Sequence, residues 1–256
     1  MTDAANTSGA QPPMPLFYKN PVPVDVERHK GWGVKKDRSF SYAAVSNALP
    51  IVLEEFPTLH AHYPIVFTAG DTPAVVVLTG IRPNENVFVD EAGRWKANTP
   101  IPAYVRRYPF IFMESPDRER LILSVEEDAS VVGPDGEFKL FDGDQAGEAG
   151  KDALNFCGIF NQSAKVTQEF CQEIKQRGLL VDQQANVTTP DGRRVSLSGF
   201  CVIDEKKFNE LPDEVFVEWR KRNWIGLIYT HMLSLGRWSQ IVEMAAQRGN
   251  GGDQAA

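Results

Sequence analysis

IPAYVRRYPFIF, residues 101–112, holds two prolines, two arginines and four aromatic residues within twelve positions. This mixture is too apolar for a solvated loop and too charged for an ordinary core strand. Pro109 lacks a backbone N–H and disfavours helical geometry in the residue before it, so an uninterrupted helix is not expected. The stretch predicts a short helical turn and then a buried strand over residues 110–112. The two arginines must reach water or a carboxylate, because an unpaired buried charge is costly.

The pattern of short antiparallel strands continues on both sides of this stretch. Residues 65–68 and 74–81 are apolar runs separated by the turn sequence GDTP, and residues 121–125 form a further run. Later in the chain, a PDG turn at 190–192 is predicted to join two strands, residues 185–188 and 195–203.

Helices are predicted mainly in the second half. Residues 151–177 and 224–248 carry apolar side chains at spacings of three and four, and Gly178 is a natural residue to follow a helix C-terminus. An earlier helix, in two pieces, is expected over residues 47–63, because Pro50 is compatible with a first helical turn. The predicted class is α+β, with antiparallel strands and hairpins in the first half, packed helices in the second, and an amphipathic C-terminal helix.

Composition narrows the range of functions. The chain has 256 residues, a net charge of −7 and 42% hydrophobic residues, which is typical of a soluble globular protein. The negative charge argues against binding nucleic acid or an anionic membrane. No apolar run approaches the roughly 20 residues that span a bilayer. We expect a disordered leader over residues 1–15, a single domain over 16–248 and a disordered tail over 249–256.

Location is inferred from the N-terminus and the cysteines. The N-terminus has no basic start and no apolar core, so it does not have the pattern of a secretory signal. Cys157, Cys171 and Cys201 are widely spaced among apolar residues, which indicates buried, reduced thiols. We therefore expect a cytoplasmic protein, with surface association after non-classical export as the alternative.

Several segments, taken in order, resemble the bacterial SapC family over nearly the whole chain outside the two tails. They are LEEF at 53–56, YPIVF at 63–67, NVFVD at 86–90 with Gly93 and Trp95, the stretch 101–112, LFDG at 140–143, LSGF at 197–200 with Ile203 and Asp204, and GLIYTHMLSL at 226–235.

The resemblance implies a role beside a bacterial surface layer (S-layer), for which the family is named. It offers no catalytic residues to carry over. The first functional hypothesis is therefore an accessory protein of envelope or surface-layer biogenesis that acts through protein contacts, without catalysis and without a cofactor.

The second hypothesis is a small-molecule-binding protein or enzyme. Arg106 and Arg107 could bind a carboxylate or phosphate, because guanidinium presents a planar, bidentate fork. Trp95 and Tyr108 could line the same pocket, for a sugar, peptide or carboxylate ligand. The alternative is that the arginines form structural ion pairs with Glu54, Glu55 or Asp90 and that the aromatic residues are core.

Histidines are the remaining candidates. His60 and His62 are a minor option for a metal site, but on a helix their side chains would point about 200° apart. His231 lies on the apolar stripe of the last helix, where a buried, hydrogen-bonded histidine is the simpler interpretation.

Overall fold

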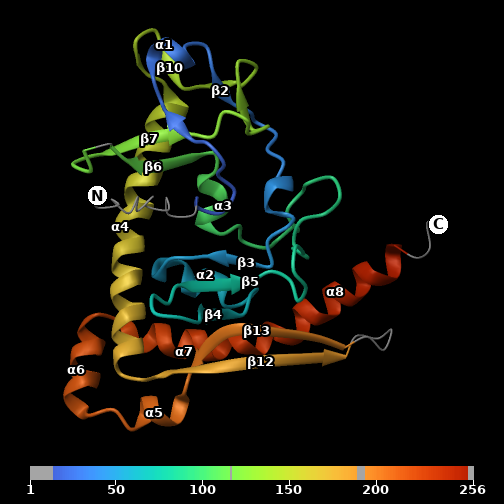
Figure 1. Ribbon diagram of the computed structural model, residues 1–256, viewed down its shortest axis with the longest axis vertical. Coiled ribbons are helices and arrows are strands. Elements are labelled where there is room, and N and C mark those ends of the chain that lie inside the picture. The colour runs from blue at the N-terminus through green and yellow to red at the C-terminus, as the bar shows by residue number, and fades with distance from the viewer. Residues whose placement is uncertain (1–13, 116, 189–193, 253–256) are drawn as a thin grey trace, which may run out of the picture.

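The computed structural model describes residues 14–115, 117–188 and 194–252. The chain forms an elongated α+β body, with a five-stranded sheet and its helices at one end and three small sheets at the other (Figure 1). The helix α4 (Glu148–Gln176) runs along one side, from the small sheets at one end to the five-stranded sheet at the other. Within the described residues no helix is both long and apolar enough to cross a bilayer.

The five-stranded sheet is antiparallel and has the strand order β12-β13-β4-β5-β3. Every side chain of β5, with the sequence VVVL, is buried, as expected for a short β-branched run in the middle of a sheet. The strands are β3 (Ala48–Pro50), β4 (Ile65–Thr68), β5 (Val75–Leu78), β12 (Leu180–Thr188) and β13 (Arg194–Ile203).

β12 and β13 form the predicted antiparallel pair. The PDG turn between them lies outside the described residues.

The other end of the molecule is built from short strands. Its sheets have the orders β1-β7-β6, β8-β2-β9 and β10-β11. The strands are β1 (Val22–Pro23), β2 (Gly33–Val34), β6 (Phe110–Glu114), β7 (Leu121–Val125), β8 (Val132–Gly133), β9 (Phe138–Lys139), β10 (Phe141–Asp142) and β11 (Gln145–Ala146).

The stretch 101–112 folds as expected. It forms the short helix α3 (Ala103–Arg107) and then enters β6, and the peptide bond between Tyr108 and Pro109 is cis. By contrast, the helix predicted over residues 47–63 is wrong for its first part. Residues 48–50 form β3, the edge strand of its sheet, where the missing N–H of Pro50 removes no bond needed by a further strand. Only the 3₁₀ turn η2 (Leu53–Glu55) and α2 (Phe56–Leu59) are helical there.

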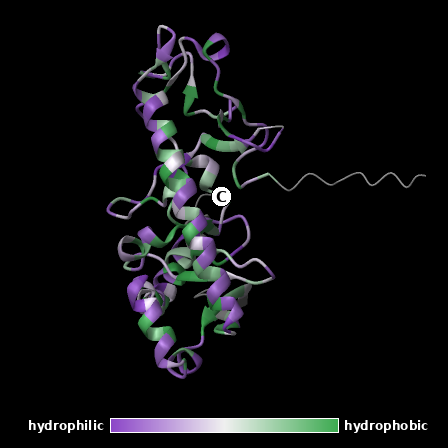
Figure 2. Ribbon diagram, turned by 90° about the vertical axis from the view of Figure 1, so that its left-hand side faces the viewer, coloured by the Kyte–Doolittle hydropathy of each residue, from purple (hydrophilic) through white to green (hydrophobic). Residues whose placement is uncertain are grey.

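α4 is one continuous helix of 29 residues. Its buried positions recur every three or four residues, and Figure 2, which faces the α4 side, shows hydrophilic and hydrophobic residues mixed along it. Gly178, with φ +66°, follows its C-terminus as predicted.

The remaining helices are α1 and those of the C-terminal region. The predicted C-terminal helix forms as α7 and α8, which are interrupted by a 3₁₀ turn, η3, that contains Gly236. The bounds are α1 (Val26–His29), η1 (Ser41–Ala43), α5 (Glu205–Asn209), α6 (Asp213–Lys221), α7 (Trp224–Ser234), η3 (Leu235–Arg237) and α8 (Trp238–Gly252).

Candidate functional site

Two adjacent pockets lie between α4 and the segments around α3. The first, which we call the arginine pocket, has a volume of about 520 Å³. Three arginines line it, one of them from outside α3, and four phenylalanines contribute aromatic walls: Arg38, Arg106, Arg107, Phe40, Phe110, Phe138 and Phe156.

The second, which we call the apolar pocket, has a volume of about 860 Å³. Its apolar lining comes from the segment 52–59, from residues 100–103 at the start of α3 and from α4: Val52, Leu59, Pro100, Ile101, Ala103, Phe156, Ile159 and Phe160. Glu54 and Asp152 also line it and are exposed to solvent.

Arg107, in the last turn of α3, lies among aromatic rings. Its guanidinium carbon is 4.5 Å from the ring centroid of Phe160, 4.6 Å from that of Tyr104 and 5.6 Å from that of Tyr18. Its Nε is buried and has no hydrogen-bond partner within the described part of the chain. Contacts of a cation with ring faces are favourable by about 0.5–2 kcal/mol, so the rings stabilise this charge in part.

Arg106 lies at the boundary between the two pockets. Its Nε donates a hydrogen bond to the carbonyl of Ile101 (3.0 Å), and its guanidinium carbon is 5.2 Å from the ring centroid of Phe156. Both pockets are lined by these three residues and by Asp152.

The alternative of structural ion pairs for the two arginines is not observed. Glu55 accepts hydrogen bonds from the backbone N–H groups of Val52 (3.1 Å) and Ala103 (2.6 Å), and burial raises its pKa. Asp90 pairs with Arg94 at 2.8 Å. Over the described ranges of the chain, neither Arg106 nor Arg107 forms an ion pair with a carboxylate.

Trp95 and Tyr108 do not line either pocket. Trp95 packs against Phe40, with 5.8 Å between ring centroids, and lines a third pocket of about 430 Å³ with Arg94 and Arg248. Tyr108 is buried, and its ring centroid is 4.1 Å from that of Tyr42. The structure therefore brings Arg106 and Arg107 together in the arginine pocket. Trp95 lies outside this pocket and packs against Phe40, which lines it.

Comparisons with known proteins identify the family of the chain. The family model SapC matches residues 24–241. The chain belongs to the SapC family. Neither the search of curated proteins nor the search of solved structures found a match.

No sequence pattern assigns three of the residues that line the pockets of this SapC-family chain. Phe156 and Phe160 stand at helical spacing on α4, but periodicity does not say which segment their side chains face. Arg38 precedes the turn η1 and lines the arginine pocket, and no motif marks it. Cys157 also lines this pocket, where burial raises its pKa to about 11, so its thiol stays protonated at neutral pH.

The histidines of this SapC-family chain lie apart. The Nδ1 of His60 is 3.0 Å from the carbonyl oxygen of Pro57, and His62 lies beside Tyr63. Among the residues that the structure describes, no group of three or more histidine, cysteine or acidic side chains is arranged to hold a metal.

His231 is fully buried and bridges two strands. Its Nδ1 donates to the carbonyl of Ile65 (2.8 Å), and its Nε2 accepts from the N–H of Ile203 (3.1 Å). Burial lowers its pKa to about 4, so the ring is neutral at pH 7.

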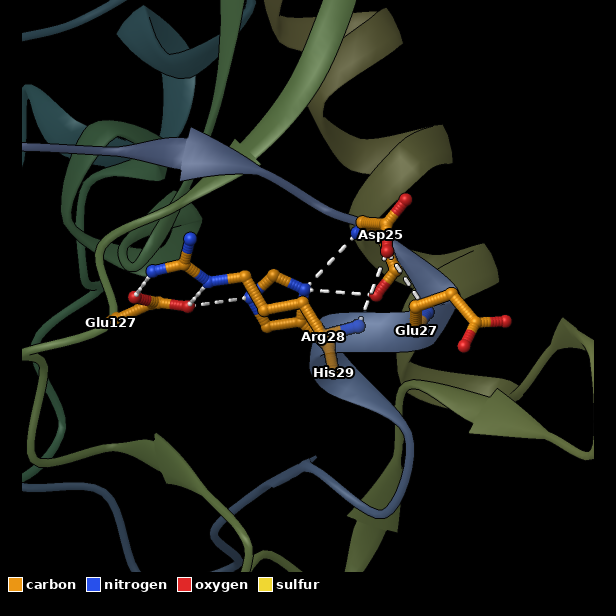
Figure 3. A network of polar contacts seen from close by, with 5 residues as sticks. All are labelled: Asp25, Glu27, Arg28, His29 and Glu127. Carbon is orange, nitrogen blue, oxygen red and sulfur yellow. Dashed lines mark hydrogen bonds and ion pairs between the residues drawn. The ribbon is translucent and has the colours of Figure 1, made fainter.

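A further polar network, absent from the sequence analysis, holds α1 in place (Figure 3). Glu127 accepts hydrogen bonds from the Nε and Nη2 of Arg28, and the Nε2 of buried His29 lies 3.0 Å from its carboxylate. Asp25 caps the helix by accepting from the N–H groups of Glu27 and Arg28. The pKa of Glu127 is lowered, and hydrogen bonds from Arg28 are the largest cause. Every member has a partner, so the network has a structural role.

Proposed function

We propose that this SapC-family protein binds an anionic small molecule in the arginine pocket. The observation that carries the proposal is Arg107, which lines the pocket and which, among the residues that the structure describes, has no carboxylate partner and no hydrogen-bond acceptor for its buried Nε. A buried polar group without a partner costs roughly 1–3 kcal/mol, and a carboxylate or phosphate beside the guanidinium would offset part of that cost through its opposite charge.

The walls of the pocket add to the proposal. Arg38 and Arg106 supply two further positive charges, and the phenylalanines offer apolar contact to the body of a ligand. Glu148 and Asp152 line the α4 side, and water screens their charges as it screens those of Arg38 and Arg106, because all four residues are exposed; Arg107 is the one half-buried charge among the residues that line the pocket. A compact ligand with one anionic group and an apolar body fits this arrangement.

The test is calorimetric titration with simple carboxylates and phosphates, of which benzoate and phenyl phosphate are the first probes. We predict that Arg107→Gln weakens binding by about 10- to 100-fold, because a hydrogen bond to a charged group contributes about 1.5–3 kcal/mol. Arg120→Gln is the matched control, since Arg120 is exposed and lines none of the three pockets. Equal affinity of the Arg107→Gln variant and the wild type would contradict the proposal.

A second proposal is supported by family membership over residues 24–241. We infer that the protein serves as a non-catalytic accessory factor of the bacterial envelope or surface layer and acts through protein contacts. Fractionation of cells tests its location, for which we expect the cytoplasm, with the cell surface as the alternative. Deletion of the gene with no change in the surface, together with no envelope protein recovered on the tagged chain, would contradict this role.

A further inference from the structure

The two pockets lie next to each other along α4 and share four lining residues, Ile101, Arg106, Asp152 and Phe156; we call the two together the groove. The α4 residues that line the arginine pocket run from Glu148 to Cys157, and those that line the apolar pocket run from Asp152 to Ser163. At a rise of 1.5 Å per residue, the distance from Glu148 to Ser163 along the helix is about 22 Å. Arg106 and Phe156, stacked on each other, stand where the two pockets meet.

Charge is distributed unevenly along this groove. All three arginines line the arginine pocket, and only Arg106 reaches the other one. The apolar pocket is walled by aliphatic and aromatic side chains, with Glu54 and Asp152 as its exposed carboxylates and Arg106 as its exposed cation. A second anionic group would meet these two carboxylates, so the charges favour a ligand with one anionic end.

Ile159 shows that the apolar pocket is open to an apolar ligand. It lines that pocket and is 60% exposed, although a large aliphatic side chain gains about 25 cal/mol for each Å² covered. Leu154, on the same helix, is 53% exposed but lines none of the three pockets, so it provides a control for Ile159.

We propose that the ligand is an anionic amphiphile, an acyl or alkyl chain with a single carboxylate or phosphate head. The inference rests on the proposed function, because the head binds to Arg107 and Arg106 in the arginine pocket. The chain then passes the stack of Arg106 on Phe156 and lies along α4 in the apolar pocket, where it covers Ile159 and Phe160.

The experiment is calorimetric titration of the whole chain with butanoate, octanoate and dodecanoate, each below the concentration at which it forms micelles. The expected result is an affinity that rises about fourfold for each additional buried methylene. Dodecylamine, which has the same chain and a cationic head, is expected to bind at least tenfold more weakly than dodecanoate. Equal affinity for the amine would overturn the assignment of the head to the arginines.

Two variants separate head from chain. Ile159→Asn is expected to weaken dodecanoate binding at least fivefold and to leave butanoate unchanged, whereas Leu154→Asn changes neither. Arg107→Gln is expected to weaken all three acids.

If the three acids bind equally and Ile159→Asn has no effect, the proposal of an amphiphilic ligand is wrong, but the proposed anion-binding function is retained. If no acid binds, or Arg107→Gln changes nothing, the proposed function itself fails.

Discussion

His231 shows how one residue joins distant elements. Its ring accepts from Ile203 of β13 and donates to Ile65 of β4, close to where the two strands pair through Cys201 and Phe67. The side chain of His231, from α7, therefore links the two strands in place of a direct backbone-to-backbone hydrogen bond. The apolar stripe of the helix predicts a buried, hydrogen-bonded histidine, but its partners lie 28 and 166 residues away and no local pattern names them.

This burial predicts a pH dependence of stability. The pKa of His231 is about 4 in the folded chain and the ordinary value is 6.5, so unfolding takes up a proton between these values. The stability that His231 contributes is fully present above about pH 6.5 and is lost as the pH falls toward 4. We expect a loss of about 2 kcal/mol between pH 7 and pH 5 in urea unfolding. His231→Gln should show a pH dependence weaker by this amount, and an unchanged dependence in that variant would contradict the assignment.

Arg107 is expected to reduce the stability of the protein that carries it. Methionine keeps apolar contact with the rings of Tyr104 and Phe160 and removes the unpartnered Nε. We predict that Arg107→Met raises the free energy of unfolding by about 1 kcal/mol while it weakens anion binding by about 10- to 100-fold, as Arg107→Gln does. Arg120→Met should change stability by less than about 0.5 kcal/mol. A large loss of stability in Arg107→Met would instead indicate a structural role for the arginine.

At the scale of elements, two glycines permit the sheet β8-β2-β9 to form. A Cβ on Gly136 would overlap the backbone of Gly33 in β2, and a Cβ on Gly33 would overlap the carbonyl of Gly136. We predict that Gly136→Ala costs about 1–3 kcal/mol in chemical unfolding. Gly158→Ala, in the middle of α4 with open space at its Cβ, should stabilise by about 0.5–1 kcal/mol. A Gly136→Ala variant as stable as the wild type would contradict the close approach.

The sequence predicts those helices and strands whose position is determined by residues close together in the chain. Pro109 ends α3 and starts β6 by its own geometry, and the periodic apolar residues of α4 and α7 define helices. Pro50 misled the prediction because a proline fits a first helical turn and an edge strand equally well. Only the position of β3 at the edge of the sheet, which depends on β5, decides between them.

The same limit applies to the site. Arg106 and Arg107 are adjacent in sequence and line one pocket, so their presence in the same site was predictable. Trp95 is near them along the chain, but Phe40 from another segment stands between. Arg38 and Phe156 come to the pocket through long-range packing, which no local pattern encodes.

At the scale of the whole molecule, α4 connects the two ends. Its residues Ala149, Ala153 and Cys157 belong to the core beneath the small sheets, whereas Phe170, Cys171 and Ile174 belong to the core of the five-stranded sheet. Between them, Phe160 packs with Val52, Ala103 and Tyr104 in a small separate cluster, next to both pockets. The groove therefore lies where the two cores meet, on a helix that contributes side chains to both.

The most direct test of the central claim is a crystal structure of the protein with dodecanoate. We predict the carboxylate within hydrogen-bonding distance of the guanidiniums of Arg107 and Arg106, and the chain along α4 beside Ile159. A ligand bound elsewhere on the molecule, with an empty arginine pocket, would contradict the account.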